Sequence, residues 1–575
     1  MAARSEFDAL KARIPGDPLA ARVFAELKRN AESILAEPPA QHKLVGPRML
    51  DQSRAALRRI STLAGLYRLT GDRRYFERAR SEMLAAASFP DWSPAHFLDL
   101  AEMTAAMGLG YDWLHAELSP EDRLEIRTAI LDKGLREGLK VYAAPKGWPK
   151  ARHNWNLVCN GGLVVGALAV AEDAPEIAGP ILAAARESAP VALRSYAPDG
   201  GWAEGPGYWD YATLYGALLI ASLESALGTD YALARSTGFP ETGEYRVQFL
   251  GPDDRTFNFA DASERAEASP QMFWLARRFE KPAYAAAERG FLERHGVGRN
   301  RLGFLALLWL EPEPAAPPAP PLDALFRGID VAFFRGAWND PSAVFVGFKG
   351  GDNEANHAHL DLGTFVLDAQ GVRWAVDLGS DDYDLPGYFG DKRWTYYRLR
   401  TEGHNTLTLE GNANQDASAR APIVAFLSVS TRAFAVADLS EAYRPAASRA
   451  LRGVALLDRR RVLLQDEIEA VEPVSPTWNF HTRAAIRIED GGRRAVLSRG
   501  GKTLIARILS PAAARFAVAP AYAPPPQARQ PEVSNLTIVS PEKARSTRIA
   551  VLLSGPGDDG PVSITPLTEW GGALN

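Results

Sequence analysis

The sequence predicts a multidomain α+β protein, in which a helical N-terminal part is followed by antiparallel β-domains. A chain of 575 residues is too long for one ordinary hydrophobic core. Apolar residues recur every three or four positions up to about residue 310, but at every second position after residue 324. Between these two parts lies the proline-rich stretch EPEPAAPPAPPLDA, which is typical of a stiff connector.

Each part is predicted from its own pattern. Segments such as LAARVFAELKRNAESIL and RMLDQSRAALRRISTLAGLYRLTGD are separated by short breaks, as in antiparallel helical pairs. SPEDRLEIRTAIL begins with Ser119 and Pro120, a good helix start. Segments such as SAVFVGFKG and GTFVLDAQGVRWAVDLG predict hairpins of a β-sandwich. We therefore predict a helical domain over 1–310, a linker over 311–324, a β-sandwich with a metal site over 325–500 and a C-terminal β-domain over 501–575.

Composition excludes several classes of function. The net charge of −5 argues against a basic nucleic-acid-binding protein, and the single Cys159 excludes an intrachain disulfide framework and a cysteine-rich zinc site. No stretch is apolar enough to span a membrane, and the N-terminus lacks the apolar core of a signal peptide. As written the chain is expected in the cytoplasm, or in the periplasm or medium if a signal was removed. The sequence leaves homo-oligomer formation open.

The β part contains an unusual pair of histidines in NHAHLDLGTFVLDAQGVRWAVDLG. Alternate residues of a strand share a face, so His357, His359 and Asp361 are expected to point the same way. The DAQG turn should bring Asp377 back toward them, and His404 begins the next predicted strand. Two imidazoles and a carboxylate suit Zn²⁺ with one position left open, although hydrogen-bonded polar residues at a sheet edge would also explain the pattern.

Basic, aromatic and amide side chains gather at three further places. Aromatic rings stack on sugar faces, and guanidinium groups bind carboxylate or sulfate, so these clusters favour an acidic sugar polymer as the partner. No phosphate-binding glycine motif is present. The candidate substrate-binding residues are Lys150, Arg152 and Trp155 in one cluster, Trp202 in the second, and Tyr383, Arg393, Tyr396 and Arg398 in the third.

Taken in order, the segments HFLDLAEMTAAMGLGYDWLHAELSPEDR, HNWNLVCNGG, DGGWAEGPGYWDY, HAHLDLGTFVLDAQGVRWAVDLG and RTEGHNTLTL resemble the heparinase II/III-like polysaccharide lyase superfamily over about residues 90–410. This superfamily includes glycosaminoglycan lyases and oligoalginate lyases. The resemblance implies an incomplete (α/α) toroid followed by an antiparallel β-sandwich and a C-terminal β-domain. It also implies cleavage of uronic-acid-containing polysaccharides such as hyaluronan, chondroitin, heparan sulfate or alginate by β-elimination.

The resemblance also implies roles for individual residues. Tyr208 matches the tyrosine that serves as base, acid or both, and His153 matches the histidine paired with it. Asn154 or Asn156 would neutralise the uronate carboxylate. His357 resembles a catalytic histidine that faces the cleft with His153 and Tyr208, and either Tyr383 or Tyr396 matches a second tyrosine. The metal ligands implied are His359, Asp377 and His404, which would hold a mainly structural zinc.

Two details leave alternatives open. Heparinase II has an acidic residue three positions after the histidine, whereas this chain has Asn156 there, which argues against a strict preference for heparin. A glycoside hydrolase would need two carboxylates flanking the bond, and Asp199, Glu204 and Asp210 lie near the second cluster in sequence. A third alternative is a carbohydrate-binding protein that has lost catalysis.

Overall fold

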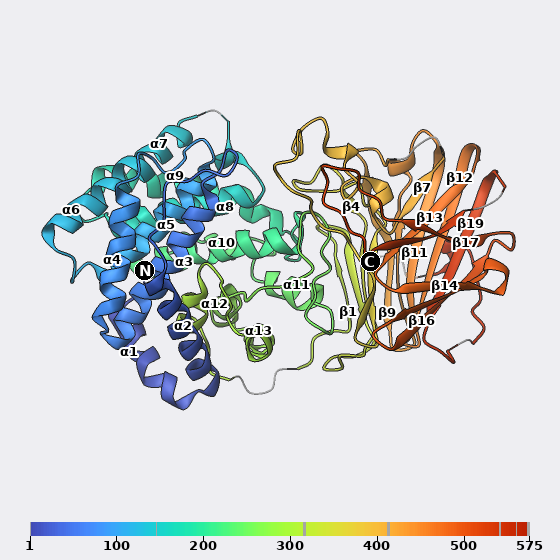
Figure 1. The fold of residues 1–575 in the computed structure, drawn as a ribbon, viewed down its shortest axis with the longest axis horizontal. Coiled ribbons are helices and arrows are strands. Elements are labelled where there is room, and N and C mark those ends of the chain that lie inside the picture. The colour runs from blue at the N-terminus through green and yellow to red at the C-terminus, as the bar shows by residue number, and fades with distance from the viewer. Residues whose placement is uncertain are drawn as a thin grey trace. The chain divides into compact units, whose positions relative to one another are not determined.

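The computed structural model describes residues 2–144, 146–313, 318–410, 414–539, 542–558 and 560–571. The chain divides into two compact units. The helical unit comprises Met1–Gly200, Tyr208–Glu244 and Glu267–Pro318, and the β unit comprises Gly201–Gly207, Tyr245–Ala266 and Ala319–Asn575. Figure 1 shows helices in the first unit and antiparallel sheets in the second, so the predicted multidomain α+β class is confirmed.

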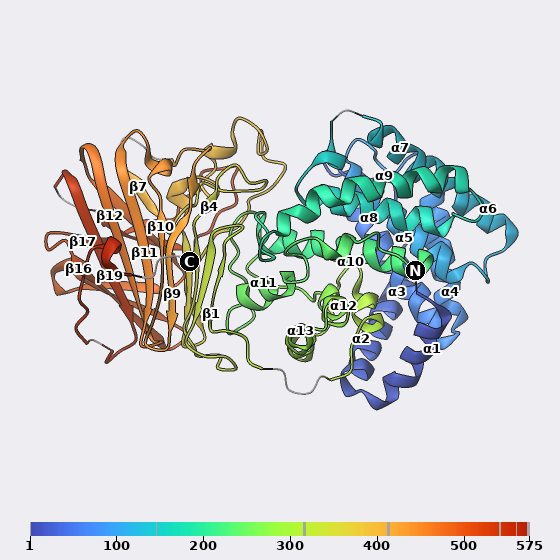
Figure 2. The ribbon, with the colours of Figure 1, turned by 180° about the vertical axis from the view of Figure 1, so that it is seen from behind.

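The N-terminal part consists of helices joined by turns and by a few longer connections, such as that between α11 and α12 (Figure 2). The first residues of α10 and the last turn of α11 belong to the β unit. The helices are α1 (Arg4–Arg13), α2 (Pro18–Ala36), α3 (Leu50–Thr70), α4 (Arg73–Ala87), α5 (Phe97–Leu114), α6 (Pro120–Ala129), α7 (Arg136–Tyr142), α8 (Asn154–Ala169), α9 (Pro175–Leu193), α10 (Gly205–Leu227), α11 (Thr242–Phe249), α12 (Gln271–Arg278), α13 (Pro282–His295) and α14 (Gly303–Leu308).

Close packing between neighbouring helices positions the candidate residues of the helical unit. Helices α4, α3, α5, α8 and α9 pack in that order, each against the next. A Cβ added to Gly162 on α8 would lie 2.2 Å from the carbonyl oxygen of Ala101 on α5, so only glycine permits this approach. The predicted start of α6 is confirmed, because Ser119 Oγ accepts a hydrogen bond from the backbone N–H of Asp122.

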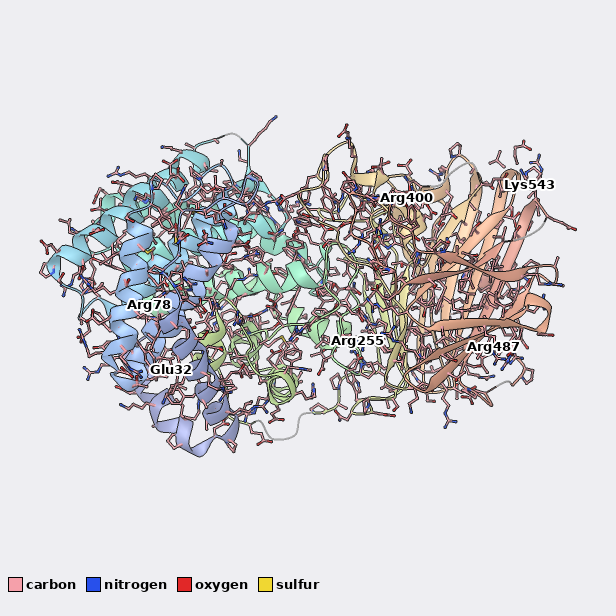
Figure 3. All side chains as sticks on the ribbon, in the orientation of Figure 1. Glu32, Arg78, Arg255, Arg400, Arg487 and Lys543 are labelled. Atoms are coloured by element: carbon pink, nitrogen blue, oxygen red, sulfur yellow. The ribbon has the colours of Figure 1, made fainter. Side chains whose placement is uncertain are left out.

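Polar contacts join the helices at the surface of the helical unit. Figure 3 labels Glu32 on α2 and Arg78 on α4, which belong to these contacts. Glu32 accepts a hydrogen bond from the hydroxyl of Tyr75 at 3.0 Å, and Arg78 donates to the Glu37 carbonyl and to Glu82. Within the described ranges, none of the helices combines the length and apolarity that crossing a bilayer would require.

The β unit is built from antiparallel strands. Its larger sheets have the orders β1-β2-β3-β5-β6, β14-β15-β16-β19-β12-β11-β10-β9 and β17-β18-β13-β7, and β4 pairs with β8. The strands are β1 (Asp323–Phe326), β2 (Val331–Arg335), β3 (Phe345–Lys349), β4 (Gly351–Asp352), β5 (Phe365–Ala369), β6 (Val372–Ala375), β7 (Leu407–Leu409), β8 (Arg420–Ala421), β9 (Ile423–Val429), β10 (Arg432–Asp438), β11 (Ala447–Leu457), β12 (Arg461–Val474), β13 (Pro476–Thr482), β14 (Ala485–Glu489), β15 (Arg494–Arg499), β16 (Lys502–Ser510), β17 (Arg515–Pro520), β18 (Ser534–Val539) and β19 (Ala544–Ser554).

One apolar core joins these sheets, as a sandwich requires. It contains Phe348 of β3, Leu464 of β12 and Trp478 of β13, all completely buried. The structure shows no division at residue 500, because β15 and β16 pair across this position and β19 pairs with β12. Strand pairing therefore makes 325–500 and 501–575 parts of one structure. Residues 314–317 of the expected linker lie outside the described residues, and its last two residues begin β1.

The hairpin that carries the histidine motif is confirmed in part. Strands β5 and β6 pair across the DAQG turn, where Gln370 and Gly371 both have positive φ, 58° and 76°. The expectation that His357 and His359 lie on a strand is wrong, because β5 begins only at Phe365. They lie in the preceding loop, where His357 has a φ of 62°, so strand alternation does not set their directions.

Candidate active site and metal centre

His357 is held by a buried carboxylate that the sequence analysis missed. Its Nδ1 lies 2.8 Å from Oδ2 of Asp261, whose side chain is completely buried. Burial alone would raise the pKa of Asp261, but hydrogen bonds from His357 and His359 hold this pKa well below its usual value. Asp261 is therefore ionised, and the His357 imidazole donates its Nδ1–H to it. Nε2 of His357 lies 3.9 Å from Oε1 of Glu204.

The same carboxylate contacts several other side chains. Its Oδ1 lies 2.9 Å from Nε2 of His359. The hydroxyl of Tyr383 donates to Oδ2 at 3.0 Å, and that of Tyr388 donates to Oδ1 at 3.3 Å. The guanidinium of Arg393 lies 3.6 Å from Oδ2. One ionised group thus orients both histidines of the motif, and its desolvation is offset by charge-assisted hydrogen bonds.

His359, Asp377 and His404 form the candidate metal centre. Each is buried and offers one ligand atom, and these atoms lie within 4.8 Å of one another. Asp377 follows β6, and His404 precedes β7. Nδ1 of His404 lies 3.1 Å from Oδ2 of Asp377. The predicted ligand set is thus brought together by the fold.

Unsatisfied polar atoms test whether a metal fits this centre. Among the described residues, Nδ1 of His359 and Nε2 of His404 are buried and have no hydrogen-bond partner. A buried nitrogen without a partner costs free energy, and coordination removes that cost. Nε2 of His359 is bonded to Asp261, which matches the common arrangement in which a ligating histidine donates its other N–H to a carboxylate. The residues present therefore fit a metal ion.

Ionisation of the two histidines differs. Burial lowers the pKa of His359, although Asp261 opposes this shift, and the neutral imidazole is the form that binds metal. Burial would also lower the pKa of His404, but the charge and hydrogen bond of Asp377 outweigh it and raise this pKa. Asp361, the remaining acid of the motif, pairs instead with buried Lys349 at 2.5 Å.

In the helical unit, the candidate residues lie at the beginnings of helices. His153 is the N-cap of α8, Asn154 is its first residue and is completely buried, and Tyr208 lies in the first turn of α10. Trp155 makes an edge contact with His96, the N-cap of α5, with ring centroids 5.1 Å apart. The beginnings of α5 and α8 therefore lie at the same end of the helical unit.

Comparison with known proteins identifies part of the chain. Residues 339–553 match the family model described as Heparinase II/III-like, C-terminal. This part of the chain is similar to the heparinase II/III-like C-terminal domain. It contains all three residues of the candidate metal centre and His357. The resemblance to the heparinase II/III-like superfamily that the motifs predicted is thereby confirmed.

Solved structures agree over most of the chain. Heparinase III aligns with a TM-score of 0.64 at 14% identity, covering 87% of this chain and 76% of that chain. Heparan sulfate lyase HepC from Pedobacter heparinus aligns with a TM-score of 0.58 at 14% identity, covering 96% of this chain and 93% of that chain. At such low identity the likeness establishes the fold. No curated protein matches the chain in sequence.

Several candidate residues are engaged in structural contacts. Asn156 is buried, and its amide nitrogen donates to the carbonyls of Pro149 and Ser188. Trp202 is buried and donates to Glu204 at 3.1 Å. Burial of the Trp202 indole argues against its predicted role in stacking on a sugar.

The third predicted cluster also proves mainly structural. Arg393 is buried and donates to the carbonyl of Ala358, Tyr396 donates to the carbonyl of Pro386, and Arg398 donates to that of Ser380. These bonds hold the 380–400 loop in place. The ring of Tyr383 stacks on that of His357, with ring centroids 6.2 Å apart. In the first predicted cluster, Lys150 and Arg152 are exposed.

The carboxylates considered for hydrolysis are also engaged. Glu204 accepts a hydrogen bond from Asn356 at 2.6 Å and lies 3.9 Å from Nε2 of His357. Asp210 accepts from Ser269 and from Gln271. Hydrogen bonding thus gives Glu204 a position beside His357, while Asp210 has structural partners in the helical unit.

Proposed function

We propose that the protein is a polysaccharide lyase that cleaves uronic-acid-containing polysaccharides by β-elimination. The observation that carries this proposal is the pairing of His357 with the buried carboxylate of Asp261, next to the candidate metal centre, whose residues lie in the part of the chain that matches the heparinase II/III-like model. Such a pair orients the imidazole and stabilises its protonated form, as the carboxylate does for the histidine of a catalytic triad. The proposed substrates are glycosaminoglycans or alginate.

The reaction requires three kinds of group. The uronate carboxylate must be neutralised so that the proton at C5 becomes acidic enough to leave. A base removes that proton, a double bond forms between C4 and C5, and the C4–O bond breaks. An acid then protonates the departing C4 oxygen. The products are a new saccharide end and an unsaturated uronate.

We assign these roles to individual residues, unit by unit. Tyr208 serves as base, acid or both, with His153 as its partner, and the Asn154 amide hydrogen-bonds the uronate carboxylate. His357 transfers or stabilises a proton through Nε2 while Asp261 holds its Nδ1. Support comes from the helix-start positions of His153 and Tyr208 and from the tautomer that Asp261 imposes on His357.

We further propose that the metal is zinc, held by His359, Asp377 and His404. Two imidazoles and one carboxylate are a common zinc ligand set. Bound there, zinc would supply electrostatic cross-linking of the loops that precede β5 and β7 and follow β6. Its role would be structural, because His359, whose Nε2 is bonded to Asp261, would then be held by the metal as well.

The proposal is tested by incubating the protein with hyaluronan, chondroitin sulfate, heparan sulfate and alginate. We expect the ultraviolet absorbance of the unsaturated uronate to rise together with new reducing ends on at least one polymer. Reducing ends without that absorbance would identify a glycoside hydrolase instead. Binding without either product would identify a carbohydrate-binding protein.

Tyr208→Phe isolates the proposed proton transfer. It removes only the hydroxyl and should lower kcat by about 10²–10⁴-fold with little change in fold. Tyr111→Phe is a matched control, because Tyr111 also sits on a helix of this unit and donates to Asp173 at 3.2 Å. Full activity of Tyr208→Phe would refute the assignment.

A further inference from the structure

A cluster of charged side chains in the helical unit has no role in the chemistry proposed above. Arg54 on α3 and Arg301 after α13 both contact one oxygen, Oε1 of Glu102 on α5. The distances are 3.1 Å from Nε of Arg54 and 3.4 Å from Nη1 of Arg301. Tyr211 on α10 donates its hydroxyl to the same oxygen. Four separate segments of the chain therefore meet at Glu102.

The cluster carries a net positive charge. Glu102 is completely buried and balances only one of the two guanidinium charges. Tyr211 adds no negative charge, because burial and then the charge of Glu102 raise its pKa well above the usual value. A structural ion pair needs one arginine. The second leaves a charge that an anion would balance.

Both arginine side chains are partly exposed. The exposed fraction is 34% for the Arg54 side chain and 25% for that of Arg301, whereas Glu102 is 0% exposed. Their central carbons lie 5.3 and 4.5 Å from the centre of the Tyr211 ring, which restricts both groups. A guanidinium has five N–H donors, and Glu102 engages few of them. Two pre-ordered, partly exposed arginine side chains suit a carboxylate or sulfate group.

The cluster lies beside a proposed catalytic residue. Tyr211 follows Tyr208 by three positions on α10, so the two share a helix face and are separated by about 4.5 Å along the axis. Glu102 lies near the beginning of α5, whose N-cap His96 contacts Trp155 at the beginning of α8. The cluster thus lies at the end of the helical unit that also carries His153.

We propose that Arg54 and Arg301 form an anion-binding subsite, which holds the carboxylate or sulfate of a sugar adjacent to the one that reacts. Glu102 and Tyr211 are positioning residues that fix the two guanidiniums. This inference rests on the proposed function for the identity of its ligand, an acidic oligosaccharide. It makes the subsite a determinant of specificity for acidic over neutral chains.

Binding is measured by calorimetry on the full chain carrying Tyr208→Phe, so that the probe is not cleaved. The probes are hyaluronan tetrasaccharide, which carries carboxylates only, heparan sulfate tetrasaccharide, which also carries sulfates, and neutral chitotetraose. We expect Arg54→Gln and Arg301→Gln each to raise Kd for an acidic tetrasaccharide about tenfold or more. A loss confined to the heparan sulfate probe would identify sulfate as the bound group, and a loss on both would identify carboxylate.

Two further variants separate binding from folding. Arg80→Gln is the matched control, because Arg80 is a similarly exposed arginine paired with Asp122 on α6, and its Kd should equal that of the parent. The double variant Arg54→Gln with Glu102→Gln removes one positive and one negative charge, so the net charge of the cluster equals that of the parent, and its Kd should still be raised.

The outcomes distinguish the subsite from the lyase proposal. Unchanged Kd in the folded Arg54→Gln, Arg301→Gln and paired variants would overturn the subsite, even if the parent protein cleaves uronate polymers. Arginine-dependent binding by a protein that produces no unsaturated uronate would uphold the subsite and refute the lyase. Absence of binding to both acidic tetrasaccharides would overturn the subsite as well.

Discussion

Nδ1 of His357 lies 2.8 Å from the buried carboxylate of Asp261, which also accepts a hydrogen bond from His359. The residue proposed for proton transfer and a proposed metal ligand are thus oriented by one acid. Nothing in the intervening sequence links them, since Asp261 precedes His357 by 96 positions. This shared carboxylate gives the first prediction.

Asp261→Asn should lower kcat about 100-fold or more with a smaller effect on KM, because an amide cannot accept both histidine N–H groups equally or stabilise a protonated His357. It should also weaken metal binding about 10–100-fold, measured as metal content after dialysis against graded chelator. Asp416→Asn, which changes a carboxylate that caps a local turn with Ser418, is the control. Wild-type kcat in Asp261→Asn would contradict the role.

Metal removal should destabilise the β unit. We expect elemental analysis to find about one zinc per chain, and chelation to lower the melting temperature, because the metal binds the folded state only. His404→Ala should abolish binding and mimic chelation, whereas His115→Ala, at an exposed position, should retain the metal. A chain that binds no divalent metal, with a melting temperature insensitive to chelator, would refute the centre.

The buried pair of Arg452 and Asp466 should contribute strongly to stability. Arg452 forms two bonds with Asp466, at 2.6 and 2.9 Å, and donates to the carbonyls of Gly363 and Asn405. Arg452→Met leaves a buried unpaired carboxylate and should lower the free energy of unfolding by about 3–5 kcal/mol. Adding Asp466→Leu should recover part of this loss in urea denaturation.

Arg461→Met serves as the comparison for that pair. Arg461 bonds to Asp458, whose side chain is 60% exposed, so its loss should cost about 1 kcal/mol or less. Equal effects of Arg452→Met and Arg461→Met would show that burial does not determine the strength of these pairs.

Buried His481 should make the fold sensitive to acid. Burial, with His404 nearby, lowers the pKa of His481 to about 3, and its ring hydrogen-bonds Tyr397 at 2.9 Å and Asn405 at 3.2 Å. The unfolded chain binds this proton at about pH 6.5 and the folded chain only near pH 3. The contribution of neutral His481 to the free energy of unfolding is therefore fully present above pH 6.5. It is lost as the pH falls from 6.5 toward 3, by up to about 5 kcal/mol.

His481→Gln removes this dependence. Urea denaturation at pH 7 and 4.5 should show that the wild type loses about 2–3 kcal/mol more than the variant does over this interval. His115→Gln, at an exposed position, should follow the wild type. Parallel pH profiles for wild type and His481→Gln would contradict the neutral buried state of His481.

The order of helices and strands could be predicted because it follows from local periodicity. The helix start at Ser119 and the DAQG hairpin depend on residues within a few positions of each other. The continuity of the β unit across residue 500 could not be predicted, because β12 pairs with β19, about 80 residues further along the chain. Such pairing depends on which strands bury their apolar faces together.

The sequence by itself determined the class of fold and the family resemblance, and the resemblance in turn implied the candidate metal ligands. Only the tertiary structure decided that Asp261 orients His357, that Asp361 pairs with Lys349, and that Arg393 and Tyr396 are buried. The physical reason is desolvation. A charged group removed from water must find its partner wherever the fold places one, and no local pattern encodes a partner that comes from a distant segment.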